Sequence, residues 1–131
     1  MFETHLDPVA GIGLRSPHMA EILERRPSTG WLEVHAENYM SGGPQMAALD
    51  KIREHYEVSV HGVGLSLGSA RGIDRTHLAR LKQVCDRYQP MLVSEHMAWS
   101  IGDGVYLNDL LPVPHDEEAL DVVCANIALM Q

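Results

Sequence analysis

The chain has 131 residues, of which 45% are hydrophobic and 21% charged, and its formal net charge is −8. This length suits one globular domain, and no apolar stretch approaches the ~20 residues that a membrane-spanning helix needs. The acidic balance argues against a nucleic-acid-binding protein, which needs clustered lysine and arginine. Because the first residues lack the basic start and apolar core of a secretory signal, we expect a cytoplasmic protein.

The first part of the sequence predicts two β-strands that alternate with two helices. A strand is predicted over residues 9–14, and a helix over 17–26 with Ser16 as a candidate N-cap. A second strand lies near residues 31–36 and is followed by a Ser-Gly-Gly-Pro loop, which strongly favours a chain reversal. A helix over 44–55 follows, because its apolar residues recur on one side.

The same alternation continues in the next part of the sequence. The third strand is predicted over residues 57–61 and is rich in β-branched residues. A glycine-rich loop separates it from a helix over 75–88, for which Asp74 is the expected N-cap. A fourth strand is predicted over residues 91–95.

The last part of the sequence contains a long connection and a final helix. Within residues 97–114, the pair Asp103-Gly104 between apolar flanks predicts a small hairpin. A helix over about 116–131 follows, with acidic residues in its first turn. The predicted buried face of this helix consists of Leu120, Val123, Ile127 and Met130.

The elements together form four strand–helix units, which we write (βα)4. Parallel strands with right-handed crossovers follow from this alternation. Because an eight-unit barrel usually needs at least ~200 residues, we interpret residues 1–131 as one partial domain, the N-terminal half of a TIM-type α/β barrel. The sequence also ends within an amphipathic helix, which favours a longer protein. The alternative is a complete, small, doubly wound α/β domain.

Polar residues gather at the carboxyl ends of the predicted strands, where the active site of an α/β barrel lies. They are Arg15, then His35 with Glu37 and Asn38, then His61, and then Glu95 with His96. His61 and His96 are candidate metal ligands, since imidazole binds iron, zinc and manganese. Neighbouring strands lie ~5 Å apart, so both histidines can converge on one ion. Each could instead form only a hydrogen bond to a neighbouring strand end.

The other polar residues of this edge have less specific predictions. Side chains alternate along a strand, so Glu95 and His96 face opposite sides, and we expect Glu95 to be a buried charge or to support a ligand. Glu37 and Asn38 are candidates for substrate binding or for supporting a ligand. Arg15 could bind a carboxylate or phosphate, or form a salt bridge between loops.

Several other residues with reactive side chains are predicted to be structural. Cys85 and Cys124 fall on apolar helix positions and are expected to be buried free thiols. The loop over residues 62–69 matches neither GxGxxG nor GxxxxGK[ST], which argues against nucleotide binding. The remaining histidines are expected to be solvated: His5, His18, His55, His77 and His115.

Five segments of the sequence form one ordered pattern. They are GIGLR at 11–15, WLEVHAENY at 31–39, HGVGLSLGS at 61–69, SEHMAWS at 94–100 and LLP at 110–112. Together they resemble the multinuclear non-heme iron-dependent oxidases (MNIO), formerly a family of unknown function. The resemblance implies a xylose-isomerase-like TIM barrel with two or three iron ions at its mouth and dioxygen as the oxidant.

The resemblance also implies a substrate class and partners. Family members modify cysteines of ribosomally synthesised precursor peptides, and many act with a partner protein that presents the peptide. His61 and His96 correspond to iron-ligating histidines of the family. Its other ligands, a Glu-Asn pair and later Asp, His and Glu residues, belong to positions after residue 131. We therefore expect the chain to be a fragment of an oxidoreductase that is inactive by itself.

Two other functions fit the residues when the resemblance is set aside. One is a metal-dependent isomerase or endonuclease-like barrel that uses divalent ions for proton transfer or hydrolysis. The other is a non-catalytic α/β domain that binds a partner through its sheet edges. Iron with visible absorbance would favour the oxidase, and zinc or magnesium would favour the isomerase or nuclease.

Overall fold

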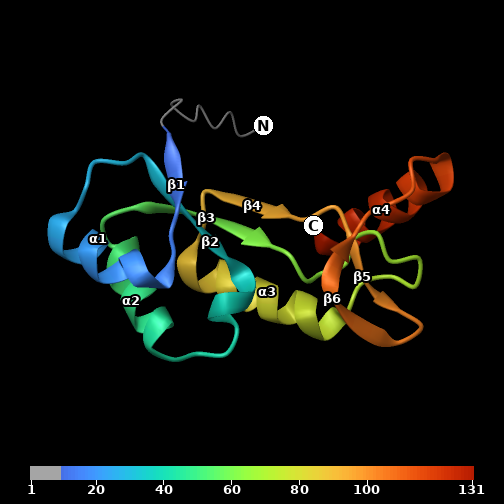
Figure 1. The fold of residues 1–131 in the computed structure, drawn as a ribbon, viewed down its shortest axis with the longest axis horizontal. Helices are drawn as coiled ribbons and strands as arrows, with labels where there is room; N and C mark the ends of the chain where they lie inside the picture. Colours follow the sequence, from blue (N-terminus) through green and yellow to red (C-terminus); the bar gives the residue numbers. More distant parts are fainter. Residues whose placement is uncertain (1–9) are drawn as a thin grey trace.

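The computed structural model describes residues 10–131 and contains a four-stranded parallel sheet (Figure 1). The strands lie side by side in chain order: β1 (Gly11–Gly13), β2 (Trp31–His35), β3 (Glu57–Gly62) and β4 (Leu92–Glu95). The helices are α1 (Met19–Arg25), α2 (Pro44–Arg53), α3 (Arg75–Tyr88) and α4 (Glu117–Met130). This α/β order of a parallel sheet with alternating helices confirms the predicted sequence of units.

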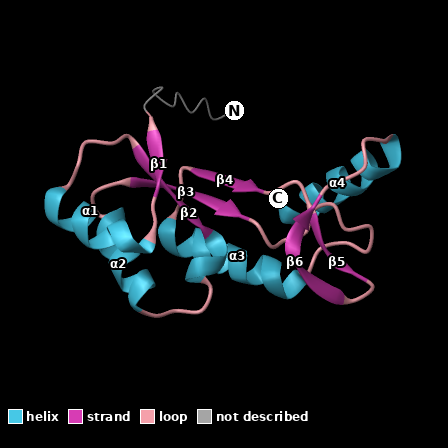
Figure 2. Ribbon diagram, in the orientation of Figure 1, coloured by secondary structure: helices cyan, strands magenta, loops and turns pink. Residues whose placement is uncertain are grey.

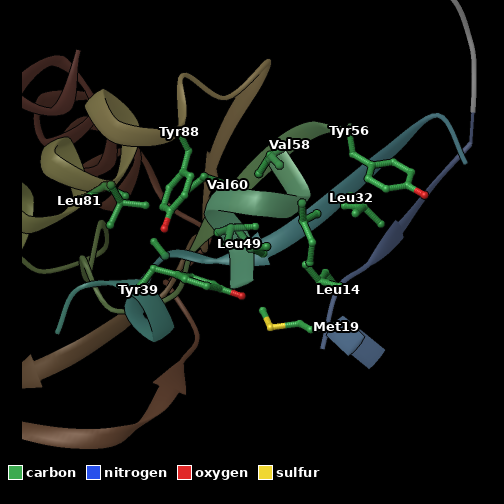
Figure 3. Packing of buried hydrophobic residues seen from close by; sticks show 14 of the residues in the cluster. Leu14, Met19, Leu32, Tyr39, Leu49, Tyr56, Val58, Val60, Leu81 and Tyr88 are labelled. Atoms are coloured by element: carbon green, nitrogen blue, oxygen red, sulfur yellow. The ribbon is translucent and has the colours of Figure 1, made fainter. Parts of the chain in front are cut away.

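One face of the sheet is covered by helices α1, α2 and α3 (Figure 2). Leu32 of β2 lies beside Val58 of β3, and Val34 lies beside Val60, and all four side chains are buried. Figure 3 shows Leu32, Val58 and Val60 in the cluster that also contains Leu49 of α2. Because side chains alternate along a strand, the residues between them point to the opposite face of the sheet. That opposite face carries the polar strand residues of the site.

Helix α3 begins where the sequence predicts. The Asp74 carboxylate accepts hydrogen bonds from the backbone N–H groups of Thr76 (2.7 Å) and His77 (3.3 Å), so this N-cap is confirmed. The N-cap prediction for Ser16 is wrong, because Ser16 is already inside a short 3-10 turn over Ser16–His18 that precedes α1. Its hydroxyl instead accepts a hydrogen bond from the Gln45 side chain at 2.7 Å.

The predicted hairpin is formed by β5 (Trp99–Gly102) and β6 (Val105–Leu111). Asp103 and Gly104 both have positive φ, 50° and 77°, as a tight hairpin turn of the I′ type requires. The Ser100 backbone N–H donates to the Ser66 hydroxyl oxygen at 2.9 Å, which attaches β5 to the glycine-rich loop. The hairpin therefore lies beyond the carboxyl ends of β3 and β4 (Figure 1).

Helix α4 buries a narrower stripe than predicted. Val123 is 5% exposed, but Leu120 is 54% exposed, so the predicted burial of Leu120 is wrong. The helix is fixed instead by Asn126, whose buried side-chain amide donates to the carbonyl oxygens of Leu67 (2.8 Å) and Ser69 (3.0 Å). A polar residue thus takes a central position on the buried side of α4.

The two cysteines are free, and their environments differ. Cys85 is half-buried, and burial raises the pKa of its thiol. Cys124 is exposed, so its predicted burial is wrong, because the described residues cover only the stripe of α4 that contains Val123 and Asn126. Among residues 10–131, no helix combines the length and apolar character needed to cross a membrane.

Candidate functional site

Three histidine rings lie in a row at the carboxyl ends of the strands. Residues His35, His61 and Ser94 are neighbours in the sheet register, and His96 follows β4 directly. The ring centroids of His35 and His61 are 5.8 Å apart, and those of His61 and His96 are 6.0 Å apart. The structure therefore brings the two predicted metal ligands together and adds His35 on the other side of His61.

The ring of His61 is oriented by a hydrogen bond. Its Nδ1 atom lies 2.8 Å from the Ser94 hydroxyl oxygen. When this nitrogen is occupied, Nε2 is the ring atom free to bind a ligand. Such an outer hydrogen bond is the usual way in which a metal-binding imidazole is held in one orientation.

The rings of His61 and His96 lie close together in an edge-to-face arrangement, with an interplanar angle of 72°. A metal ion ~2.1 Å from an imidazole nitrogen lies roughly 3 Å from the ring centroid, so two rings on one ion have centroids at most roughly 6 Å apart. The separation of 6.0 Å equals this limit, which two rings reach only on opposite sides of an ion, so adjacent ligand positions would require the rings to turn toward each other. Within residues 10–131, no group of three or more His, Cys, Asp or Glu side chains is arranged to hold a metal ion. Two imidazoles alone do not complete a metal site.

Glu37 holds the loop that follows His61. Its Oε1 atom accepts hydrogen bonds from the backbone N–H groups of Val63 (3.0 Å) and Gly64 (2.8 Å) and lies 3.2 Å from His77 Nε2. Burial opposes ionisation of this carboxyl, but the bonds from His77 and the two amides outweigh it and lower its pKa to about 2. Glu37 is therefore a carboxylate at neutral pH.

His77 does not have the solvated position that the sequence predicts. Its side chain is 19% exposed and forms an ion pair with Glu37. The hydrogen bond to Glu37 raises the pKa of His77 and outweighs the opposite effect of burial. Solvent exposure was also predicted for four other histidines. It is confirmed for His18, His55 and His115, and His5 lies outside the described residues.

Gly64 leaves the space in which Glu37 and His77 meet. A Cβ atom at Gly64 would lie 2.8 Å from His77 Cε1 and 3.2 Å from Glu37 Oε1. We expect Gly64→Ala to lower the free energy of unfolding by about 1–3 kcal/mol, because the pair must shift to accept the methyl group. Urea unfolding measures the change. Gly13→Ala is the matched control, since nothing lies within 4 Å of a Cβ at Gly13, and equal effects of the two substitutions would contradict the prediction.

Glu95 lies on the helix-facing side of β4. In the sheet register it is the neighbour of Gly62, and a Cβ at Gly62 would overlap its carboxylate. Its Oε1 accepts a hydrogen bond from the His96 backbone N–H at 3.1 Å, while Oε2 is buried without a partner among the described residues. Burial, reinforced by the nearby Glu37 charge, raises the pKa of Glu95 to about 7.

Arg15 and Asn38 line a cavity beside the histidine row. The cavity has a volume of about 430 Å³ and lies at the carboxyl ends of β1 and β2, with Glu33 and His35 in its wall. Arg15 and Asn38 are both exposed. Within residues 10–131, the Arg15 guanidinium forms no ion pair, so the predicted salt bridge between loops is not present there.

Comparison with known proteins places this chain in a family. The model of the RiPP precursor modification enzymes MbnB/TglH/ChrH matches residues 9–131, which is nearly the whole chain. The chain belongs to this family. The match confirms the resemblance to the MNIO enzymes, whose former status as a family of unknown function agrees with the names of the relatives.

Those relatives are UPF0276 proteins of bacteria. A protein of Vibrio vulnificus is 48% identical over 132 residues, covering 100% of this chain and 45% of its own length. A protein of Chromobacterium violaceum is 47% identical over 128 residues, with 98% and 46% covered. A protein of Bordetella pertussis is 50% identical over 123 residues, with 93% and 43% covered. The chain spans a little under half the length of the curated relatives it matches.

The partnership of Glu37 with His77 is not predicted by the sequence pattern. The available signal was indirect: a carboxylate after β2, glycines after β3 and a histidine in the first turn of α3 all lie near one edge of the sheet. The two residues are forty positions apart in the sequence. Only the packing of α3 against that edge brings their side chains within hydrogen-bond distance. His35 was included in the polar clusters, and the sheet register now places it next to His61.

Proposed function

We propose that the chain is the N-terminal half of a TIM-type barrel enzyme that uses iron and dioxygen to modify cysteine residues of a ribosomally synthesised precursor peptide. Membership of the precursor-modification family supports the peptide substrate. The parallel sheet with helices on one face supports the half-barrel. The observation that carries the metal proposal is the 6.0 Å separation of the His61 and His96 rings at the carboxyl edge.

Each residue of the edge has a proposed part. His61 and His96 would hold iron, and bound iron would supply the redox chemistry for oxidation of the cysteine by dioxygen. Ser94 fixes the ring of His61 through Nδ1, which leaves Nε2 as the nitrogen free to bind a metal ion. Glu37 holds the loop after His61 in one conformation through the two backbone N–H groups that it accepts. Glu95 supports the same strand ends from the helix side.

Two imidazoles are too few ligands for a catalytic iron site. We propose that the other ligands come from a second half of the barrel, as the greater length of the relatives suggests. The domain over residues 1–131 would then be inactive alone. We also propose that the enzyme acts in the cytoplasm, where precursor peptides are synthesised, and that a partner protein presents the peptide.

The test is the metal content of the full-length enzyme. We expect His61→Ala and His96→Ala each to lose most of the bound iron, because each removes one ligand from a site with open positions. Elemental analysis and visible absorbance measure the loss. His55→Ala is the control, since His55 is exposed and lies outside the site.

Two outcomes would contradict the proposal. Unchanged iron in His61→Ala would show that this histidine is not a ligand. Stoichiometric zinc or magnesium in the active protein, without iron, would favour an isomerase or nuclease instead.

A further inference from the structure

We propose that the cavity beside His35 is a subsite for a carboxylate of the peptide substrate and that Arg15 binds this carboxylate. The inference rests on the proposed function, because it assumes that a peptide cysteine lies near His61 and His96. It adds a requirement for an acidic group close to that cysteine.

Arg15 is placed for an external ligand. It precedes the 3-10 turn at Ser16–His18 in an extended backbone conformation, and its side chain lines the cavity of about 430 Å³. Its guanidinium has no ion-pair partner among the described residues, although Glu33 lies in the same cavity wall. A guanidinium offers a planar pair of N–H donors that matches a carboxylate.

The other polar groups of the cavity favour a peptide over a free phosphate. The Asn38 amide can donate to and accept from a peptide bond, and the Glu33 carboxylate can accept a peptide N–H. The same Glu33 charge would repel a phosphate dianion. An extended peptide satisfies all three side chains when it places a single negative charge at Arg15.

The cavity adjoins the histidine row at His35. His35 forms part of its wall, and its ring lies 5.8 Å from that of His61, which lies 6.0 Å from that of His96. An extended chain advances about 3.3 Å per residue. A peptide whose cysteine lies at His61 and His96 therefore reaches the cavity within about four residues. The carboxylate belongs either to an aspartate or glutamate at that spacing or to the chain terminus.

Binding of model peptides to the full-length, iron-loaded protein under anaerobic conditions tests the subsite. The probes are fluorescein-labelled peptides with one cysteine and an aspartate three residues before or after it, each with an amidated C-terminus. The third peptide has asparagine in place of aspartate and is therefore neutral at this position. The fourth peptide also has asparagine, but its C-terminus, three residues after the cysteine, is a free carboxylate. We expect at least one carboxylate peptide to bind about tenfold or more tightly than the neutral peptide. The peptide that does so identifies whether a side chain or the terminus is the source.

Variants of Arg15 decide whether this residue causes the preference. Arg15→Gln is expected to abolish the tenfold difference without changing the affinity of the neutral peptide, and Arg15→Lys to retain part of it. Arg26→Gln is the matched control, because Arg26 is exposed, has no ion pair among residues 10–131 and lines a different cavity. It should leave the preference intact.

Several results would overturn the subsite. They are an equal affinity of all peptides for the wild-type protein, no binding of any peptide, and a preference that persists in Arg15→Gln. A loss of thermal stability in Arg15→Gln together with weaker binding of the neutral peptide would show that Arg15 pairs within the protein, which also overturns it. The iron content of the same samples tests the proposed function separately.

Discussion

Replacement of Glu37 by alanine is expected to lower the free energy of unfolding by about 3 kcal/mol. The substitution leaves the backbone N–H groups of Val63 and Gly64 and the ring of His77 without their shared acceptor. These groups are costly to leave unpaired because the Glu37 and His77 side chains are only 25% and 19% exposed. Urea unfolding at pH 6 measures the loss.

The control for Glu37 is an ion pair of similar length on the surface. Asp50 accepts two hydrogen bonds from Arg87, at 2.9 Å and 2.6 Å, and the two side chains are 40% and 50% exposed, about twice as much as Glu37 and His77. Asp50→Ala is expected to cost much less than Glu37→Ala, because solvent screens an exposed pair. Equal losses would show that Glu37 contributes only an ordinary surface interaction.

The stabilising effect of Glu37 depends on pH in a direction that its pKa fixes. Folding lowers the pKa from 4.5 to about 2, so this stabilisation is present above pH 4.5 and is lost as the pH falls toward 2. The pKa of His77 is raised above 6.5, so its contribution is present below pH 6.5 and is lost as the pH rises through the raised value. The stability difference between wild type and Glu37→Gln should therefore be largest between pH 4.5 and 6.5. A difference that grows as the pH falls from 4 to 2 would contradict the assignment.

Leu32→Ala is expected to have a similarly large effect, about 3 kcal/mol, through loss of core packing. Leu32 is fully buried in β2, which is paired on both sides, and it lies beside Val58 under the helix layer (Figure 3). Thermal or urea unfolding measures the loss. Leu32→Met conserves volume and should cost less than about 1.5 kcal/mol, so a Leu32→Ala variant no less stable than Leu32→Met would refute this account of the core.

Features that depend on neighbouring residues were predicted correctly from the sequence. Helix α3 occupies Arg75–Tyr88 because Asp74 caps it and its apolar residues recur at helical spacing. The hairpin turn forms at Asp103 and Gly104 because this pair tolerates positive φ. In both cases the determining interaction lies within a few residues of the element.

Features that depend on distant residues were not predicted. The environment of His77 is set by Glu37, forty residues earlier, and no local pattern reports such a pairing. The exposure of Leu120 depends on which side of α4 meets the glycine-rich loop, and this is decided by the hydrogen bonds of Asn126. Helical periodicity identifies an apolar stripe but not the surface that covers it.

The candidate site could be predicted only in part from the sequence. The positions of His61 and His96 at adjacent strand ends follow from the alternation of elements, and the structure places their rings 6.0 Å apart. The neighbour relation of His35 to His61 needs the exact strand register, which the sequence does not specify. The roles of Arg15, Glu37, Asn38 and Glu95 in binding remain predictions, and the peptide-binding experiment tests that of Arg15.

The hydrogen bonds of Glu37 also limit which parts of this α/β fold can be exchanged by recombination. Glu37 follows β2, whereas Val63, Gly64 and His77 belong to the next unit of the chain. Consider a chimera in which the β2 unit comes from an unrelated protein. The backbone N–H groups of Val63 and Gly64 and the ring of His77 would lose their acceptor, unless the new unit carried an acidic residue at the position of Glu37. We therefore expect the second and third units to depend on each other, so that exchanging one without the other lowers the stability of the fold.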